Sequence, residues 1–175
     1  DGAYRVLKDM GADISFLNHR IMAAEEVYDI RVRSSNLKGI NIPRKFSPTM
    51  IDDYPILAVA ASMAKGKTYF KGINELKFKE SDRFSGIINL LTKSGVRVES
   101  KKDGIIIHGK SELKKGDIEI ETNLDHRMAM SALVMGLVSK KEVKIDNYET
   151  IKTSFPSFYK VMLKIGAKLS KNKNR

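Results

Sequence analysis

The stretch Ile87-Ile-Asn-Leu-Leu-Thr-Lys-Ser-Gly-Val-Arg-Val98 carries two periodicities in succession. Its apolar residues first recur every three or four positions, as on one face of a helix, and then alternate, as along a strand. Gly95 stands between the two patterns, where a helix end favours a residue with positive φ. The stretch therefore predicts a helix that ends at a glycine and continues as a strand.

The same helix–glycine–strand pattern occurs twice more, which indicates an internal repeat. Residues 4–14 read Tyr-Arg-Val-Leu-Lys-Asp-Met-Gly-Ala-Asp-Ile, and residues 159–169 read Tyr-Lys-Val-Met-Leu-Lys-Ile-Gly-Ala-Lys-Leu. Both copies place a glycine, Gly11 or Gly166, directly after the last helical position. We therefore expect three equivalent helix ends along the chain.

A second repeated unit lies between these copies. Asp52 and Asp125 each open an apolar helical stretch that leads into a strand-like stretch, and they lie 73 positions apart (125 − 52). Ser81 and Ser154, which precede the middle and last glycine-ended helices, have the same separation of 73 (154 − 81). Because two pairs of corresponding residues share a separation of 73, we predict that the chain is built from a repeated α/β module. The chain stops partway through a third copy of this module.

The coarse secondary structure follows from these patterns. Helices are predicted over residues of about 3–10, 52–64, 83–93, 126–138 and 156–164. Strands are predicted over about 12–17, 25–33, 67–73, 117–121 and 142–147, with a hairpin of 96–100 and 104–108 that turns at residues 102–104. Pro43 and Pro48 mark a loop that we interpret as lying inside a single α/β domain.

Composition narrows the possible partners. The chain has 175 residues, no cysteine and a formal net charge of +11, so it has neither a disulfide framework nor a thiol nucleophile. Its most apolar stretch, residues 128–138, is too short to span a bilayer, and we expect a cytoplasmic protein with no membrane partner. The positive charge favours anionic partners, namely nucleic acid, acidic membranes or phosphorylated and carboxylated metabolites.

Three polar clusters coincide with the predicted helix starts. Helix N-termini bind anions through free N–H groups, but Arg83 and Arg127 lie in first turns, where a cation opposes the helix dipole. A bound anion would remove that conflict. In the alternative interpretation, Asp52, Ser81 and Asp125 are simple N-caps and the arginines pair with nearby carboxylates. The recurrence on one module favours a site formed by residues 51–53, 79–83 and 125–127.

The sequence offers little for a metal or a nucleotide cofactor. Its histidines, His19, His108 and His126, are far apart and do not form a ligand set, so no metal is expected. Neither the GxxxxGK[ST] loop nor the GxGxxG fingerprint is present. Glu80, flanked by cations, could act as a general acid or base if it is partly buried.

Four motifs resemble those of the 5-enolpyruvylshikimate-3-phosphate synthase family. Glu-Leu-Lys-Phe-Lys-Glu-Ser-Asp-Arg at 75–83 looks like its E-L-R-x-K-E-[ST]-D-R signature. Asp-His-Arg-Met-Ala-Met at 125–130 looks like its D-H-R-[IM]-A-M segment. Residues 51–55 resemble the acidic helix start, and residues 153–158 resemble the late S-[FY]-P-x-F stretch. The resemblance covers essentially the whole chain in order and spacing.

The resemblance implies a fold and a reaction. Members have two similar domains of βαβαββ modules whose helix N-termini point at the cleft between them, and this chain resembles the C-terminal domain over residues 1–175. They transfer the enolpyruvyl group of phosphoenolpyruvate to the 5-hydroxyl of shikimate 3-phosphate and release phosphate. The reaction passes through a tetrahedral adduct, needs no cofactor and belongs to aromatic amino-acid biosynthesis through the shikimate pathway. The full-length enzyme is expected to be a monomer.

The resemblance also implies residue roles. Asp52 would hold the substrate hydroxyls and accept the proton of the attacking oxygen, and Glu80 would protonate the methylene carbon of phosphoenolpyruvate. Lys79 would stabilise charge near shikimate 3-phosphate, while Arg83 and Arg127 would clamp the phosphoenolpyruvate carboxylate.

Two positions depart from the family pattern, and one domain is missing. Thr153 stands where many members have a phosphate-contacting lysine, which leaves Lys152 as the nearest candidate. Some members have asparagine in place of Glu75. The N-terminal domain, which binds the shikimate phosphate, is not in this sequence, so we expect the chain alone to be inactive.

Two other functions remain open at this point. The related UDP-N-acetylglucosamine enolpyruvyl transferase shares the architecture, although the motifs at 79–83 and 125–130 argue against it. A basic RNA-binding module would fit the charge of +11, but it predicts basic residues spread over one face with aromatic residues among them. The charges here concentrate at helix starts, so no nucleic-acid partner is expected.

Overall fold

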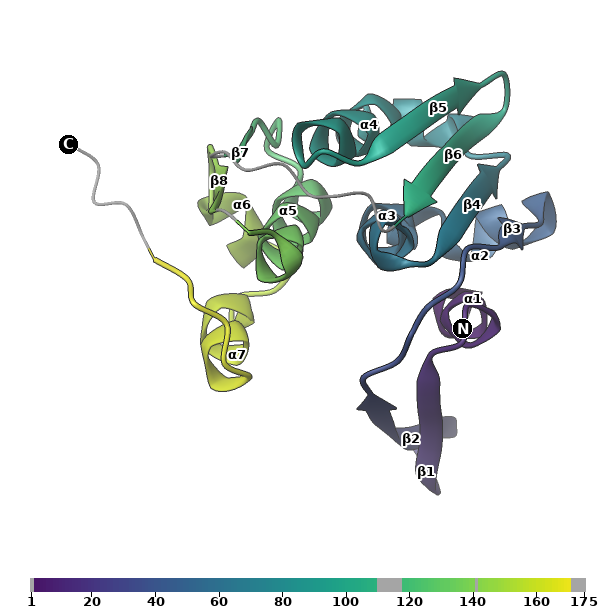
Figure 1. Cartoon of the computed structure of the whole chain (residues 1–175). Helices are drawn as coiled ribbons and strands as arrows, with labels where there is room; N and C mark the ends of the chain where they lie inside the picture. The colour runs from purple at the N-terminus through teal and green to yellow at the C-terminus, as the bar shows by residue number, and fades with distance from the viewer. Residues whose placement is uncertain (1, 110–117, 141, 171–175) are drawn as a thin grey trace.

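The centre of the chain is one complete βαβαββ module. We describe residues 2–109, 118–140 and 142–170 of a computed structural model. The central module comprises β3 (Asn41–Ile42), α3 (Tyr54–Met63), β4 (Gly66–Lys71), α4 (Arg83–Lys93), β5 (Arg97–Lys101) and β6 (Gly104–Gly109). Its sheet has the order β3-β4-β6-β5, in which β3 and β4 are parallel and the other pairs antiparallel. The predicted module is confirmed, and its helices pack beside the sheet (Figure 1).

Half a module flanks the centre on each side. The N-terminal half-module, α1 (Gly2–Asp9), β1 (Asp13–Met22) and β2 (Glu25–Arg33), corresponds to the helix and antiparallel hairpin of the central module. The C-terminal half-module begins as the parallel unit β7 (Ile118–Ile120), α5 (His126–Val138) and β8 (Val143–Ile145), and continues with α6 (Glu149–Lys152) and α7 (Phe158–Lys164). The chain therefore contains, in order, the second half of one module, one complete module and the first half of another.

The three predicted helix ends have the same hydrogen bonds. Gly11, Gly95 and Gly166 adopt φ values of +95°, +86° and +94°. In each case the residue after the glycine donates its N–H five residues back, as Val96 does to the Leu91 carbonyl at 2.9 Å. This is the Schellman arrangement, which needs a left-handed residue and therefore favours glycine. The helix–glycine repeat read from the sequence is confirmed.

Several local predictions need correction. No strand is assigned to residues 167–170, so the third repeat copy lacks its strand in the part of the chain that the structure describes; Ala167 and Leu169 pack beside α7 instead. The loop around Pro43 and Pro48 contains short helical turns over 44–53, because proline is tolerated at a helix start. The predicted strand 117–121 is observed as 118–120, and position 117 lies outside the described residues.

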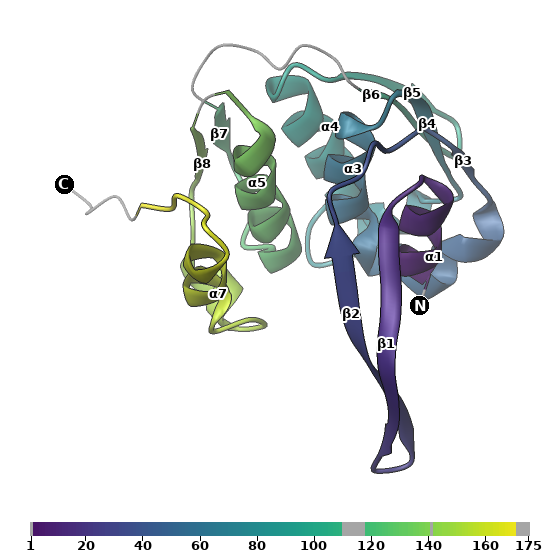
Figure 2. The same ribbon diagram turned by 60° about the horizontal axis from the view of Figure 1, so that its bottom comes forward.

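The helices α3, α4 and α5 lie side by side, with β1 and β2 projecting away from them (Figure 2). The hydroxyl of Ser62 on α3 points at the Met135 sulfur on α5 at 4.0 Å, and these residues are again 73 positions apart. The two repeats therefore pack through equivalent positions. In the described parts of the chain, no helix is long and apolar enough to cross a membrane.

A charge cluster on the hairpin of the central module makes stability depend on pH. Hydrogen bonds from Lys101 and then His108 lower the pKa of Glu99 to about 2. Because the folded-state pKa is depressed, this stabilisation is present above the unfolded pKa of 4.5 and is lost as the pH falls toward 2. We expect Glu99→Gln to lower the urea midpoint at pH 7, with the difference shrinking below pH 4.5. A difference that is constant from pH 7 to pH 3 would contradict this assignment.

Candidate active site

The N-terminal ends of α3, α4 and α5 converge around one buried arginine. Arg83 is the first residue of α4, and its side chain is 0% exposed. A cation buried at the positive end of a helix dipole needs strong compensation. That compensation comes from three carboxylates on three separate segments of the chain.

Each nitrogen of the Arg83 guanidinium donates to a different carboxylate. Nε donates to Asp125 Oδ2 at 2.7 Å and Nη1 to Asp52 Oδ1 at 2.8 Å. Nη2 donates to Glu80 Oε2. The Nη edge, which has the two-pronged geometry that binds a carboxylate, therefore faces the two residues predicted to be catalytic. Arg83, Asp52 and Glu80 are brought together as expected.

Asp125 links this arginine to the start of α5. Its Oδ1 accepts the N–H groups of Arg127 at 2.9 Å and Met128 at 3.2 Å, so it is the N-cap of the helix. Its Oδ2 accepts from Ser81 Oγ at 2.9 Å as well as from Arg83. Burial raises the pKa of Asp125, but the Arg83 hydrogen bond and charge outweigh burial and hold that pKa below its usual value.

The other two supposed caps have different roles. Asp52 lies in a 3-10 turn, η2 (Ile51–Asp53), and makes no capping hydrogen bond to α3. Asp82 rather than Ser81 is the N-cap of α4, since it accepts the Ser85 N–H at 3.0 Å. The capping part of the alternative interpretation therefore holds for Asp125 alone, whereas the pairing of both arginines with nearby carboxylates is confirmed. The Asp52 carboxylate is available for contacts other than capping.

Lys79 contacts the same cluster through two carboxylates. Its Nζ is 2.9 Å from Glu75 Oε1 and 3.6 Å from Asp52 Oδ1. The hydrogen bond to Glu75 is the largest cause of a raised pKa for Lys79, and Asp52 contributes in the same direction against the effect of burial. Lys79 is therefore charged over the whole neutral range.

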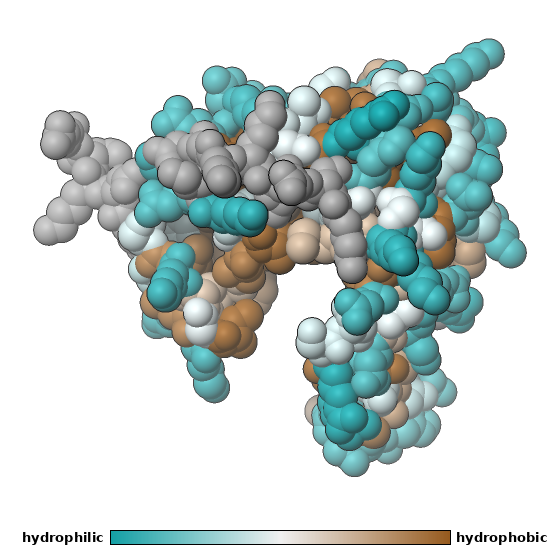
Figure 3. All heavy atoms as spheres, in the orientation of Figure 1, coloured by the Kyte–Doolittle hydropathy of each residue, from teal (hydrophilic) through white to brown (hydrophobic). Residues whose placement is uncertain are grey.

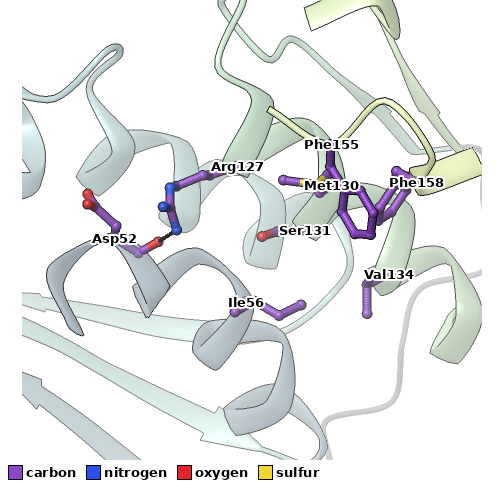
Figure 4. A pocket seen from close by; sticks show the side chains of 8 residues that line it. All are labelled: Asp52, Ile56, Arg127, Met130, Ser131, Val134, Phe155 and Phe158. Atoms are coloured by element: carbon purple, nitrogen blue, oxygen red, sulfur yellow. Dashed lines mark hydrogen bonds between the residues drawn. The ribbon is translucent and has the colours of Figure 1, made fainter. Parts of the chain in front are cut away.

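Arg127 lies between this cluster and a neighbouring cavity. Its Nη1 donates to the Asp52 carbonyl at 3.0 Å and lies 3.6 Å from Asp53 Oδ1. Figure 4 shows Arg127 and Asp52 at one end of the cavity and aromatic and aliphatic side chains at the other. The cavity measures about 220 Å³ and is lined by Asp52, Ile56, Arg127, Met130, Ser131, Val134, Phe155 and Phe158.

Lys152 does not join the cluster. It lies on α6, and its Nζ pairs with Glu149 on the same helical turn. The predicted site included Ser81 and Asp125, within 79–83 and 125–127, but the sequence suggested no role for them other than helix capping. The 73-residue offset between Asp52 and Asp125 was the signal that could have linked them. Within the described ranges, no three His, Asp or Glu side chains gather as a metal-ligand set.

Comparison with known proteins places this chain in a family. The sequence pattern of EPSP synthase (3-phosphoshikimate 1-carboxyvinyltransferase) matches residues 2–162. The chain belongs to the EPSP synthase family. Its curated relatives include the 3-phosphoshikimate 1-carboxyvinyltransferases of Paramagnetospirillum magneticum, 49% identical over 169 residues, and Bartonella quintana, 48% identical over 170. Each alignment covers 97% of this chain but 38% of the relative, so the chain spans well under half of their length.

Solved structures agree with this membership. The EPSP synthase of Acinetobacter baumannii superposes with a TM-score of 0.88 at 38% identity, covering 97% of this chain and 40% of that one. The enolpyruvyl transferase NikO from Streptomyces tendae superposes at 0.63 with 18% identity, covering 95% of this chain and 35% of that one, which supports the fold alone. The predicted α/β enolpyruvyl transferase fold is confirmed.

Proposed function

We propose that this chain forms half of the active site of an EPSP synthase, which converts phosphoenolpyruvate and shikimate 3-phosphate into the 5-enolpyruvyl product and phosphate. The observation that carries the proposal is the Arg83 network. It joins a two-pronged cation to Asp52 and Glu80, the two carboxylates that the family motifs assign to proton transfer. The family to which the chain belongs supplies the choice of reaction.

The proposed chemistry needs one proton acceptor and one proton donor. Asp52 takes the proton of the 5-hydroxyl as its oxygen attacks C2 of phosphoenolpyruvate, and Glu80 delivers a proton to C3. The resulting tetrahedral adduct then loses phosphate and a C3 proton, which restores the enol ether. Glu80 is 56% exposed and Asp52 is 44% exposed, so both can reach a substrate from the solvent side.

The cations around these carboxylates have positioning roles in the proposal. Arg83 and Arg127 bind the phosphoenolpyruvate carboxylate, which requires Asp52 or Glu80 to release its Nη hydrogen bond to Arg83. Lys79 stays charged and lies 3.6 Å from Asp52, which suits contact with shikimate 3-phosphate. Lys152 pairs with Glu149 and remains a candidate phosphate contact from the family resemblance alone.

The rest of the enzyme is proposed to supply the other half of the site. We assign residues 1–175 to the C-terminal domain, and an N-terminal domain would bind the shikimate phosphate. The curated relatives, of which this chain matches 38%, support this division. A cytoplasmic, monomeric enzyme with no cofactor and no nucleic-acid partner remains our prediction from the sequence.

Uncovered apolar surface supports the same division. One face of the hairpin carries Phe16, Tyr28, Ile30 and Val32, all exposed, whereas Ile105 and Ile107 on the equivalent hairpin of the central module are buried. Figure 3 shows a hollow between the projecting hairpin and the part that contains α5 and α7, with apolar residues mainly on the side of α5 and α7. In the central module, the unit β3-α3-β4 covers this position, so the same kind of unit would cover the hairpin in the longer enzyme.

A chimera tests the proposed function. This chain would replace the matching 38% of the Paramagnetospirillum magneticum relative, and phosphate release would be followed with phosphoenolpyruvate and either acceptor. We expect release with shikimate 3-phosphate, none with UDP-N-acetylglucosamine, and none from the isolated chain. A folded chimera that releases no phosphate with either acceptor would overturn the proposal, and release with the sugar nucleotide alone would favour the sister enzyme.

A further inference from the structure

Arg83 bridges two aspartates that occupy equivalent positions in the internal repeat. Asp52 and Asp125 precede α3 and α5, the corresponding helices of the central module and the C-terminal half-module. The guanidinium contacts Asp52 through Nη1 and Asp125 through Nε. One cation is therefore held between two carboxylates that share an origin in the repeat but differ in their surroundings.

The two aspartates differ in burial and in the number of groups that they bind. The Asp125 side chain is 0% exposed and accepts four hydrogen bonds, whereas the Asp52 side chain is 44% exposed. A ligand that competes for the Arg83 Nη edge can displace Asp52 but meets no exposed part of Asp125. The Nε bond to Asp125 is therefore the one that can persist when a substrate binds.

The backbone before Asp125 supports a specific placement. Asn123 and Leu124 both adopt positive φ, at +51° and +59°, although neither is glycine. Such residues are held in a disfavoured region only where their surroundings over-determine the conformation. The Leu124 carbonyl accepts a hydrogen bond from the Thr150 hydroxyl, which fixes this turn from α6. The left-handed pair turns the chain directly into the buried Asp125.

We propose that Asp125 is a positioning residue that holds the Nε side of Arg83, so that the Nη edge stays aimed at the phosphoenolpyruvate carboxylate during turnover. Asp52, its repeat equivalent, is left free for proton transfer. The inference rests on the proposed function of Arg83. The inference gives the two aspartates different roles. The buried Asp125 holds Arg83, and the exposed Asp52 transfers the proton.

The simpler alternative is that Asp125 serves only as the N-cap of α5. Asparagine separates the two possibilities because its side-chain oxygen can still accept the Arg127 and Met128 N–H groups. Its amide nitrogen would then replace Oδ2 and face the Arg83 Nε–H. Because both groups are hydrogen-bond donors, no hydrogen bond could form between them. Asp125→Asn therefore keeps the cap and removes the anchor.

The kinetic test compares equivalent substitutions in the active chimera. We expect Asp125→Asn to raise the KM for phosphoenolpyruvate by about tenfold or more, as for a lost hydrogen bond to a charged group, and to leave the KM for shikimate 3-phosphate unchanged. Asp52→Asn should instead lower kcat, with the phosphoenolpyruvate KM within about threefold. In an Arg83→Lys background, Asp125→Asn should add no further increase in that KM.

Two further measurements extend the test, one that needs no activity and one made in the active chimera. In the 175-residue chain, NMR exchange of the Arg83 Nε–H should accelerate about tenfold or more in Asp125→Asn and little in Asp52→Asn. Ser81→Ala removes only the hydroxyl that donates to the same Oδ2 and should raise the phosphoenolpyruvate KM by about threefold.

The outcomes separate the two proposals. An unmodified chimera that folds but releases no phosphate refutes the proposed function, while the Nε–H exchange still decides the anchor. Asp125→Asn with unchanged phosphoenolpyruvate KM and unchanged exchange overturns the anchoring role. A loss of kcat in Asp125→Asn equal to that in Asp52→Asn, with no change in KM, would also overturn it, because the duties would not be divided.

Discussion

Replacing Arg83 with methionine is expected to lower the free energy of unfolding of this chain by about 3–5 kcal/mol, as found when one partner of a buried ion pair is removed. The side chains of Arg83 and Asp125 are both 0% exposed, so the substitution leaves a buried carboxylate without its counter-charge. Asp52 and Glu80 lose a donor as well, but water can replace it because both are partly exposed. Urea unfolding at pH 7 measures the change.

Arg97→Met is the matched control for this experiment. Arg97 also pairs with a carboxylate, that of Glu99 at 3.1 Å, but its side chain is 72% exposed. Exposed pairs contribute about 0–1 kcal/mol, so a small change is expected. Equal losses of unfolding free energy in the two variants would show that burial of Arg83 does not decide its contribution.

The destabilisation caused by Arg83→Met should depend on pH, because the pKa of Asp125 is lowered in the folded chain. The destabilisation should be full above the usual carboxyl pKa range and should decline as the pH falls through the lower folded-state pKa of Asp125.

Glu80→Gln is expected to reduce kcat of the active chimera by about 10²–10⁴-fold, the usual contribution of a general acid or base. Glutamine can still accept the hydrogen bond from Arg83 Nη2, so the network and the fold should persist. It cannot deliver a proton to the methylene carbon of phosphoenolpyruvate. Initial rates of phosphate release give kcat, and a thermal melt within about 2 °C of the unmodified protein would confirm that the loss is chemical.

Glu75→Gln provides the comparison for Glu80. Glu75 also contacts a cation of the cluster, Lys79, but has no hydrogen bond to Arg83 among the contacts described. We expect its substitution to change kcat by less than about tenfold, since it removes only an exposed contact. If Glu75→Gln and Glu80→Gln reduced kcat equally, general electrostatics and not proton transfer by Glu80 would explain both.

Most of the fold was predictable because its signals are local. The bounds predicted for α4 and α5, residues 83–93 and 126–138, are those observed. Apolar periodicity, the polar residues that begin these helices and the glycine after α4 all act within a few residues. Missed elements were short or dependent on partners, such as the two-residue strand β3, which exists only because it pairs with β4.

The residues that form the site were predictable from the sequence, but the contacts among them were not. The polar clusters at three helix starts indicated that Asp52, Lys79, Glu80, Arg83 and Arg127 would converge, and the structure brings these five together. That Arg83 is buried and Asp125 is its anchor depends on how α4 packs against α5, and the two residues are 42 positions apart. The 73-residue offset relates Asp125 to Asp52, but it carries no information about the contact between Asp125 and Arg83.

The uneven distribution of complete and partial modules has a consequence for folding. The central module forms its sheet from strands within residues 41–109. Within the part of the chain that the structure describes, each half-module has one pair of strands without the other pair of its sheet. Cooperative stability should therefore be concentrated in the centre, where the sheet is complete, and decline toward both ends. Residues 41–109 would form the nucleus on which the flanking helices α1 and α5 dock, so the Arg83–Asp125 contact reports the docking of the C-terminal half-module.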